Sequence, residues 1–148
     1  AVGHGFDAYF ERRKVITDKM KHGIARSWHQ RFMPFLAWLG VDQLQFNATQ
    51  SGSYAWARLG FDFRDDGVRK EMINEFRVWL AVNYHVPSLD DRAVSLRHAW
   101  DLAYFTDESG REIGKEFLLQ YGNHTLQGWA ARFSLHPDYP GWRLLFKD

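Results

Sequence analysis

The spacing of the apolar residues changes near residue 40, and this change limits the fold more than any other feature of the chain. Six apolar residues before it recur mainly at steps of three or four, the spacing of one helix face: Ile24, Trp28, Phe32, Phe35, Leu36 and Leu39. Beyond Gly40, a residue type that often ends helices, Leu44, Phe46 and Ala48 alternate with polar neighbours, as in a strand. The pattern predicts a helix over about Ala25–Leu39, with Pro34 inside it, and then a strand.

Helical and strand-like segments continue to alternate along the rest of the chain. Three further helices are expected from apolar spacing: over Tyr54–Leu59, over 68–86 and over about 88–103. Segments 61–63 and 141–147 have strand-like patterns, whereas 114–121 fits either a helix or a strand. Because helices and strands interleave, the sequence predicts an α/β or α+β fold with an aromatic-rich core.

Length and charge limit the class of protein. The 148 residues, 45% of them apolar, suit one globular domain over 1–148, and the Ala1 terminus suggests excision from a longer protein. A formal charge of +1 provides no basic field for nucleic acid, so no nucleic-acid partner is expected. No apolar run approaches membrane-spanning length, and the first residues lack the pattern of a signal peptide. We therefore expect no membrane span and favour a soluble, cytoplasmic protein.

Several kinds of catalytic or metal centre lack their sequence pattern. The chain has no cysteine, which excludes disulfides, thiol nucleophiles and Cys-ligated zinc. Its seven histidines form no H-x-x-x-H or H-E-x-x-H pattern, so no metal site is predicted. The acidic pairs Asp65–Asp66 and Asp90–Asp91 lie at predicted helix starts, where negative charge is favourable, and are assigned to structure.

A basic turn precedes the first predicted helix. It contains Lys21, Gly23, Ile24, Ala25 and Arg26. The backbone N–H groups at a helix start have no partner within the helix, and small residues let an anion such as a pyrophosphate approach them. The alternative is that Gly23 only bends the chain into the helix and that the cations face solvent.

Segment 16–63 resembles the GNAT N-acetyltransferase superfamily in the order of its elements. The resemblance lies in the G-I-A turn at Gly23, the long helix, the strand, and the short helix that ends in A-x-x-L-G-F at Gly60-Phe61. It implies a mixed sheet flanked by helices, transfer of an acyl group to an amine acceptor, and an acyl-CoA or acetyl-CoA donor held by Lys21, Gly23, Ile24, Ala25 and Arg26. Two positions depart from the family pattern: Met20 before the turn, and Trp56 where the family usually has a tyrosine.

Two residues are candidates for proton transfer. Tyr54 is the tyrosine nearest to Trp56, and a phenol can protonate a departing thiolate, whereas an indole N–H only donates a hydrogen bond. His98, next to Trp100 and Asp101, is a candidate to pair with a carboxylate and act as a base. A buried, hydrogen-bonded structural role is the alternative for His98.

A non-catalytic binding module is the second hypothesis for function. Aromatic residues make up 17% of the chain, and most of them fall on apolar helix faces. Three aromatic residues do not follow a helical spacing: Trp129, Tyr139 and Trp142. They are predicted to line a groove for a ligand or a protein partner. The string from Gly52 to Asp62 is also similar to uncharacterised bacterial domains of phage-associated or toxin-like proteins.

Overall fold

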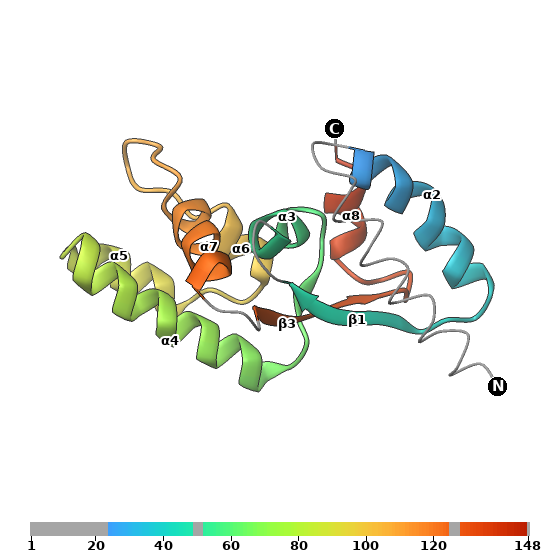
Figure 1. Cartoon of the computed structure of the whole chain (residues 1–148), viewed down its shortest axis with the longest axis horizontal. Helices are drawn as coiled ribbons and strands as arrows, with labels where there is room; N and C mark the ends of the chain where they lie inside the picture. Colours follow the sequence, from blue (N-terminus) through green and yellow to red (C-terminus); the bar gives the residue numbers. More distant parts are fainter. Residues whose placement is uncertain (1–23, 49–51, 125–127, 148) are drawn as a thin grey trace. The chain divides into compact units, whose positions relative to one another are not determined.

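The computed structural model describes residues 24–48, 52–124 and 128–147 (Figure 1). The chain divides into two compact units, Ala1–Asp42 and Gln43–Asp148, which are treated separately below. The prediction of a single domain over 1–148 stays a prediction.

In the first unit, the described residues form helix α2 (Ile24–Trp38) and the turn that ends it. Pro34 lies inside the helix, as expected. Gly40 has a φ of +87°, and the N–H groups of Gly40 and Val41 donate to the carbonyls of Ala37 and Leu36 at 3.0 and 3.1 Å. A left-handed glycine with such bonds is a common helix ending, so the predicted helix and its stop are confirmed.

The second unit contains a three-stranded sheet in the order β1-β3-β2. Its strands are β1 (Gln43–Ala48), β2 (Asp62–Phe63) and β3 (Trp129–Ser134), and β3 pairs antiparallel with both neighbours. The strands predicted at 44–48 and 61–63 are confirmed, while the central strand β3 was missed. The described pairings are all antiparallel and do not confirm a GNAT-like mixed sheet, which stays a prediction.

The second unit also contains six helices among its described residues: α3 (Gly52–Arg58), α4 (Asp66–Asn83), α5 (Pro87–Val94), α6 (Ala99–Ala103), α7 (Ile113–His124) and α8 (Gly141–Leu145). In Figure 1, α4 and α5 run side by side, and α3, α6 and α7 pack together. Asp65 accepts a hydrogen bond from the Val68 N–H at 2.9 Å and caps α4, as its place in the sequence suggested. The combination of helices and a sheet confirms the predicted α/β class in its coarse form.

Two predictions about the later segments are wrong. The helix expected over 88–103 is interrupted between α5 and α6, because the Ser95 hydroxyl donates to the Arg92 carbonyl at 2.8 Å and Asp101 caps the start of α6. Segment 141–147, expected to be a strand, contains α8 instead. A segment as short as Trp142–Phe146 carries too little periodicity to distinguish a strand from a helix. Segment 114–121, left open, is part of α7.

Aromatic rings fill two parts of the second unit's core. Around the sheet, Phe61 contacts Phe46, Trp56 and Phe133 at centroid distances of 4.9, 5.1 and 5.2 Å. Among the helices, Phe76 contacts Phe105 and Phe117, each at 5.1 Å. Phe61, Phe76 and Phe133 are fully buried. The predicted aromatic-rich core is therefore confirmed.

Two glycines let the backbone before β2 approach the start of α8. Gly60 has a φ of +104°, and a Cβ atom built on it would collide with the Gly141 carbonyl. A Cβ on Gly141 would in turn collide with the Gly60 carbonyl. The Tyr139 hydroxyl donates to that same Gly60 carbonyl at 2.5 Å. The approach fixes the turn that leads into β2.

We predict that Gly60→Ala destabilises the protein more than Gly110→Ala. Gly110 also has a positive φ, of +88°, but nothing lies within 4 Å of a Cβ built on it. Gly110→Ala should therefore cost only the left-handed strain of about 1 to 2 kcal/mol. Gly60→Ala adds a backbone collision and should lower the free energy of unfolding by at least about 2 kcal/mol more, as in overpacked cores. Equal losses in chemical denaturation would contradict the close approach.

Candidate functional site

The carboxylate of Asp62 joins strand β2 to the start of helix α6. Asp62 is 7% exposed. Its Oδ1 accepts the backbone N–H of Phe63 at 2.8 Å and that of Ala99 at 2.9 Å. Its Oδ2 lies 2.7 Å from His98 Nδ1. A buried carboxylate needs such partners, and here they include an imidazole from a segment 36 residues further along the chain.

His98 is held in place at its backbone and at its ring. It occupies the N-cap position of α6, and its N–H donates to Asp101 Oδ2 at 3.0 Å. Its ring stacks on Trp100, with centroids 4.3 Å apart and planes inclined by 15°. Trp100 packs against one face of the imidazole ring, and Asp62 binds its Nδ1 atom. Together they restrict the orientation of the ring.

The other ring nitrogen of His98 points away from these partners. The His98 side chain is 37% exposed, against 10% for that of Asp62. The ring of His98 forms its hydrogen bond to another side chain through Nδ1, with Asp62. A carboxylate at Nδ1 favours the neutral tautomer that has its proton on Nδ1 and a lone pair on Nε2. This is the arrangement of a general base whose tautomer is set by a carboxylate.

A row of polar residues crosses the sheet at the level of Asp62. Asp62 on β2 lies opposite Arg132 on β3, and Arg132 lies opposite Gln45 on β1. Directly opposed residues in antiparallel strands share one face of the sheet. The Arg132 Nε atom is buried and has no hydrogen-bond partner among the described residues. Arg132 is therefore the cross-strand neighbour of Asp62.

Tyr139 supports this region through a hydrogen bond to the turn before β2. Burial raises the pKa of its phenol far above the usual value, the negative charge of Asp62 raises it further, and Arg132 opposes both effects. The hydroxyl therefore stays protonated and serves as a donor to the Gly60 carbonyl. Its role is to hold the turn before β2.

Tyr54, the second candidate for proton transfer, lies in a different environment. It is a buried residue of α3, with the Arg58 Cζ atom 5.5 Å and the Lys115 Nζ atom 5.2 Å from its ring centroid. Burial raises the pKa of its phenol, and the positive charge of Arg58 partly opposes this. No contact within the described part of the chain brings Tyr54 and His98 together. A catalytic role for Tyr54 stays a prediction.

Trp56 is a core residue. It is 8% exposed and meets the ring edges of Phe46 and Phe61 at 4.8 and 5.1 Å. In this setting its side chain stabilises the fold.

The predicted cofactor turn falls largely outside the described residues. Lys21 and Gly23 are not among them, and the described helix begins with Ile24 and Ala25, whose side chains are also not described. Arg26 is described and lies partly exposed on α2. Acyl-CoA binding at this turn stays a prediction.

The predicted aromatic groove is wrong for two of its three residues. Trp129 is 2% exposed in the central strand and donates from Nε1 to the Ser53 carbonyl at 3.1 Å, and Tyr139 is 8% exposed. Trp129 is buried because it lies in the missed strand β3, which is the middle strand of the sheet. Tyr139 lies between β3 and α8, and its ring contacts that of Phe133 at 4.8 Å. Trp142 is partly exposed, and its Nε1 donates to the His136 carbonyl at 2.9 Å.

Sequence reasoning found His98 but missed Asp62 as its partner. The nearest carboxylate in sequence, Asp101, instead binds the His98 backbone. One signal for Asp62 was present: it is a charged residue between two phenylalanines, in a segment predicted to be a strand. An aspartate in such a position needs a polar partner.

The comparisons with known proteins add no identity. No family model matches the chain, and no curated protein or solved structure is significantly similar to it. Within the described residues, no three His, Asp or Glu side chains gather as a metal site would require, and no described helix is long and apolar enough to cross a membrane. The Asp62–His98 pair is the candidate functional site.

We predict that Asp62→Asn and Asp62→Ala differ in stability. An asparagine amide oxygen can still accept the Phe63 and Ala99 N–H groups, so Asp62→Asn should change the free energy of unfolding by less than about 1.5 kcal/mol. Alanine leaves both donors without an acceptor and should cost about 2 to 4 kcal/mol. Chemical denaturation measures both values. Similar losses would show that the carboxylate does not organise this junction.

Proposed function

We propose that the Gln43–Asp148 unit is an N-acyltransferase domain in which His98, oriented by Asp62, is the general base. The observation that carries the proposal is the 2.7 Å contact between Asp62 Oδ2 and His98 Nδ1, in a histidine whose side chain is 37% exposed. The nature of the transferred group is supported by the resemblance of segment 16–63 to GNAT proteins. The role of His98 as the base is supported by its contacts with Asp62 and Trp100.

The chemistry requires one proton acceptor at the attacking nitrogen. An amine must lose a proton as it forms a bond to the carbonyl carbon of the donor, while the carbon–sulfur bond of the thioester breaks. His98 Nε2 receives the amine proton, and the same nitrogen can return it to the departing thiolate. The Asp62 carboxylate stabilises the imidazolium present between the two transfers. The acyl donor supplies the activated carbonyl.

Aromatic stacking contributes to this role by restricting the imidazole. Trp100 covers one face of the His98 ring, so the ring cannot turn without losing both the stack and the bond to Asp62. A base that is held in one orientation spends less free energy on ordering in the transition state.

The alternative function is a non-catalytic binding module on the same scaffold. The observation in its favour is Trp56, which replaces the tyrosine expected from the GNAT pattern and lies buried against Phe46 and Phe61. In this alternative the Asp62–His98 pair only stabilises the junction of β2 with α6.

The proposal predicts release of a thiol from acetyl-CoA when the chain is incubated with a panel of primary amines. Because the chain contains no cysteine, a thiol reagent reports only the released coenzyme. His98→Gln should lower the rate by at least about 100-fold, the usual contribution of a general base. Absence of thiol release by the unmodified chain would contradict acyl transfer.

His136→Gln is the matched control. His136 is also next to an aspartate, with Nδ1 3.7 Å from Asp138 Oδ2, but their side chains are 67% and 92% exposed. Its loss should leave the rate unchanged. A His98→Gln variant that keeps the full rate, with its fold verified by circular dichroism, would contradict the role of His98.

A further inference from the structure

Helix α2 of the first unit has apolar side chains on two opposite faces. Its buried face includes Met33 and Leu36, which are 0% and 6% exposed. The opposite face, near the C-terminal end of the helix, has Phe35, Trp38 and Leu39, which are 49%, 78% and 54% exposed. Residues three or four positions apart lie on the same side of a helix, so these three side chains form one stripe. We call it the α2 apolar stripe.

The aromatic rings of the stripe form a continuous apolar surface. Trp38 is the most exposed large apolar side chain among the described residues. Its ring stacks on that of Phe35, with centroids 6.2 Å apart and planes inclined by 27°. A single exposed apolar side chain is common on soluble proteins, whereas a contiguous group of them marks a surface that binds a partner. The stripe is therefore a candidate interaction surface.

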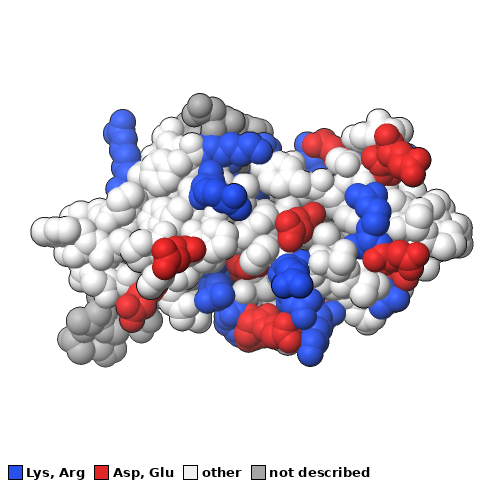
Figure 2. Space-filling view, turned by 180° about the vertical axis from the view of Figure 1, so that it is seen from behind, with Lys and Arg blue, Asp and Glu red and all other residues white. Residues whose placement is uncertain are grey.

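The stripe belongs to a basic part of the sequence. Positions 19–41 contain four Lys and Arg residues and neither Asp nor Glu. Segment 1–42 has seven Lys and Arg residues against four Asp and Glu, a net charge of +3, whereas the whole chain has +1. Figure 2 shows acidic and basic side chains interspersed over one face of the protein. The excess of positive charge is thus concentrated in the segment that carries the stripe, and it favours a negatively charged partner.

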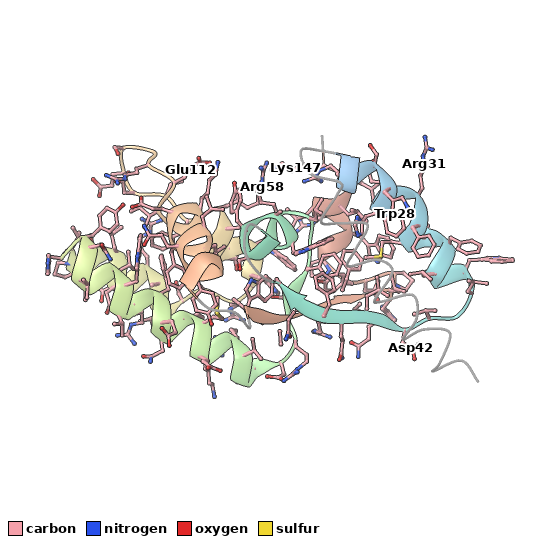
Figure 3. The ribbon with its side chains drawn as sticks, in the orientation of Figure 1. Trp28, Arg31, Asp42, Arg58, Glu112 and Lys147 are labelled. Atoms are coloured by element: carbon pink, nitrogen blue, oxygen red, sulfur yellow. The ribbon has the colours of Figure 1, made fainter. Side chains whose placement is uncertain are left out.

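Arg31 places one of these charges on the same face of α2 as the stripe. It lies four residues before Phe35 and is exposed, and Figure 3 shows its side chain projecting outward from the helix. A guanidinium pairs with phosphate oxygens. Tryptophan, phenylalanine and leucine side chains insert at the boundary between lipid head groups and acyl chains. This face of α2 thus combines a group that binds phosphate with apolar anchors one turn away.

We propose that the α2 apolar stripe anchors the protein to the surface of an anionic lipid bilayer. The Phe35, Trp38 and Leu39 side chains insert at the level of the head groups, and Arg31 pairs with a lipid phosphate. Helix α2 has 15 residues, fewer than the about 20 that cross a bilayer, so it lies in the interface. Basic charge spread along positions 19–31 matches an extended negative surface better than one acidic side chain. The proposal does not depend on the proposed acyl transfer, because the stripe and His98 belong to different units.

The test is co-sedimentation of the full chain with two kinds of vesicle: phosphatidylcholine alone, and equal parts of phosphatidylcholine and phosphatidylglycerol. The chain should bind the mixed vesicles, and binding should weaken as salt rises. Trp38→Ser should lower the partition coefficient at least about tenfold, because it removes the largest apolar anchor. Arg31→Gln should lower it about fivefold, the contribution of one basic residue near an anionic surface.

Val82→Ser provides the control for loss of an exposed apolar side chain. Val82 lies on α4 in the other unit and is 67% exposed, so its replacement should leave the partition coefficient unchanged. Circular dichroism verifies that each variant keeps its fold. No step of the test measures thiol release, so its outcome is independent of the acyltransferase proposal.

Three results would overturn the proposal: no binding of the unmodified chain to the mixed vesicles, equal binding to both kinds of vesicle, or equal losses from Trp38→Ser and Val82→Ser. Analytical ultracentrifugation without lipid tests a second copy of the chain as the partner. A dimer that Trp38→Ser abolishes, in a chain that does not bind vesicles, would assign the stripe to self-association and contradict a membrane anchor.

Discussion

The second unit depends on one buried carboxylate, that of Asp62. It accepts two backbone N–H groups and contacts one imidazole nitrogen, and these partners belong to two segments that are far apart in sequence. An isolated charge in such a place would be costly, so the fold forms only with the start of α6 docked against β2. The same requirement orders His98, because its ring is the partner of the second carboxylate oxygen. The structural and proposed catalytic roles of Asp62 therefore have a common cause.

The surroundings of Asp62 are arranged to keep it in position. β2 is a two-residue strand at the edge of the sheet and has little pairing of its own. Its register against β3, the contact between Gly60 and Gly141, and the bond from Tyr139 to the Gly60 carbonyl fix the segment on either side. A short strand that carries a buried carboxylate is thus held by contacts from residues 131–141 rather than by its own length.

Residue spacing and capping residues predicted the helices and strands that depend mainly on residues close to them in sequence. The helix that ends at Gly40, the alternating strand after it, and the helix capped by Asp65 have signals within a few residues of themselves. The central strand β3 gave no such signal, because it is buried by two neighbours that come from distant parts of the chain. The division between α5 and α6 depends on side-chain bonds of Ser95 and Asp101, and the pairing of His98 with Asp62 spans 36 residues. The spacing of residues along the sequence does not show which residues far apart in the chain come into contact. The GNAT-like arrangement stays a prediction.

The most direct test of this account is the tautomer of His98, measured by ¹⁵N NMR of the imidazole ring under alkaline conditions, where histidines are neutral. Donation to Asp62 Oδ2 predicts that the proton resides on Nδ1 and that Nε2 has the chemical shift of an unprotonated nitrogen. A proton on Nε2, or a mixture of tautomers like that of a solvent-exposed histidine, would contradict the claim that Asp62 sets the orientation and tautomer of His98.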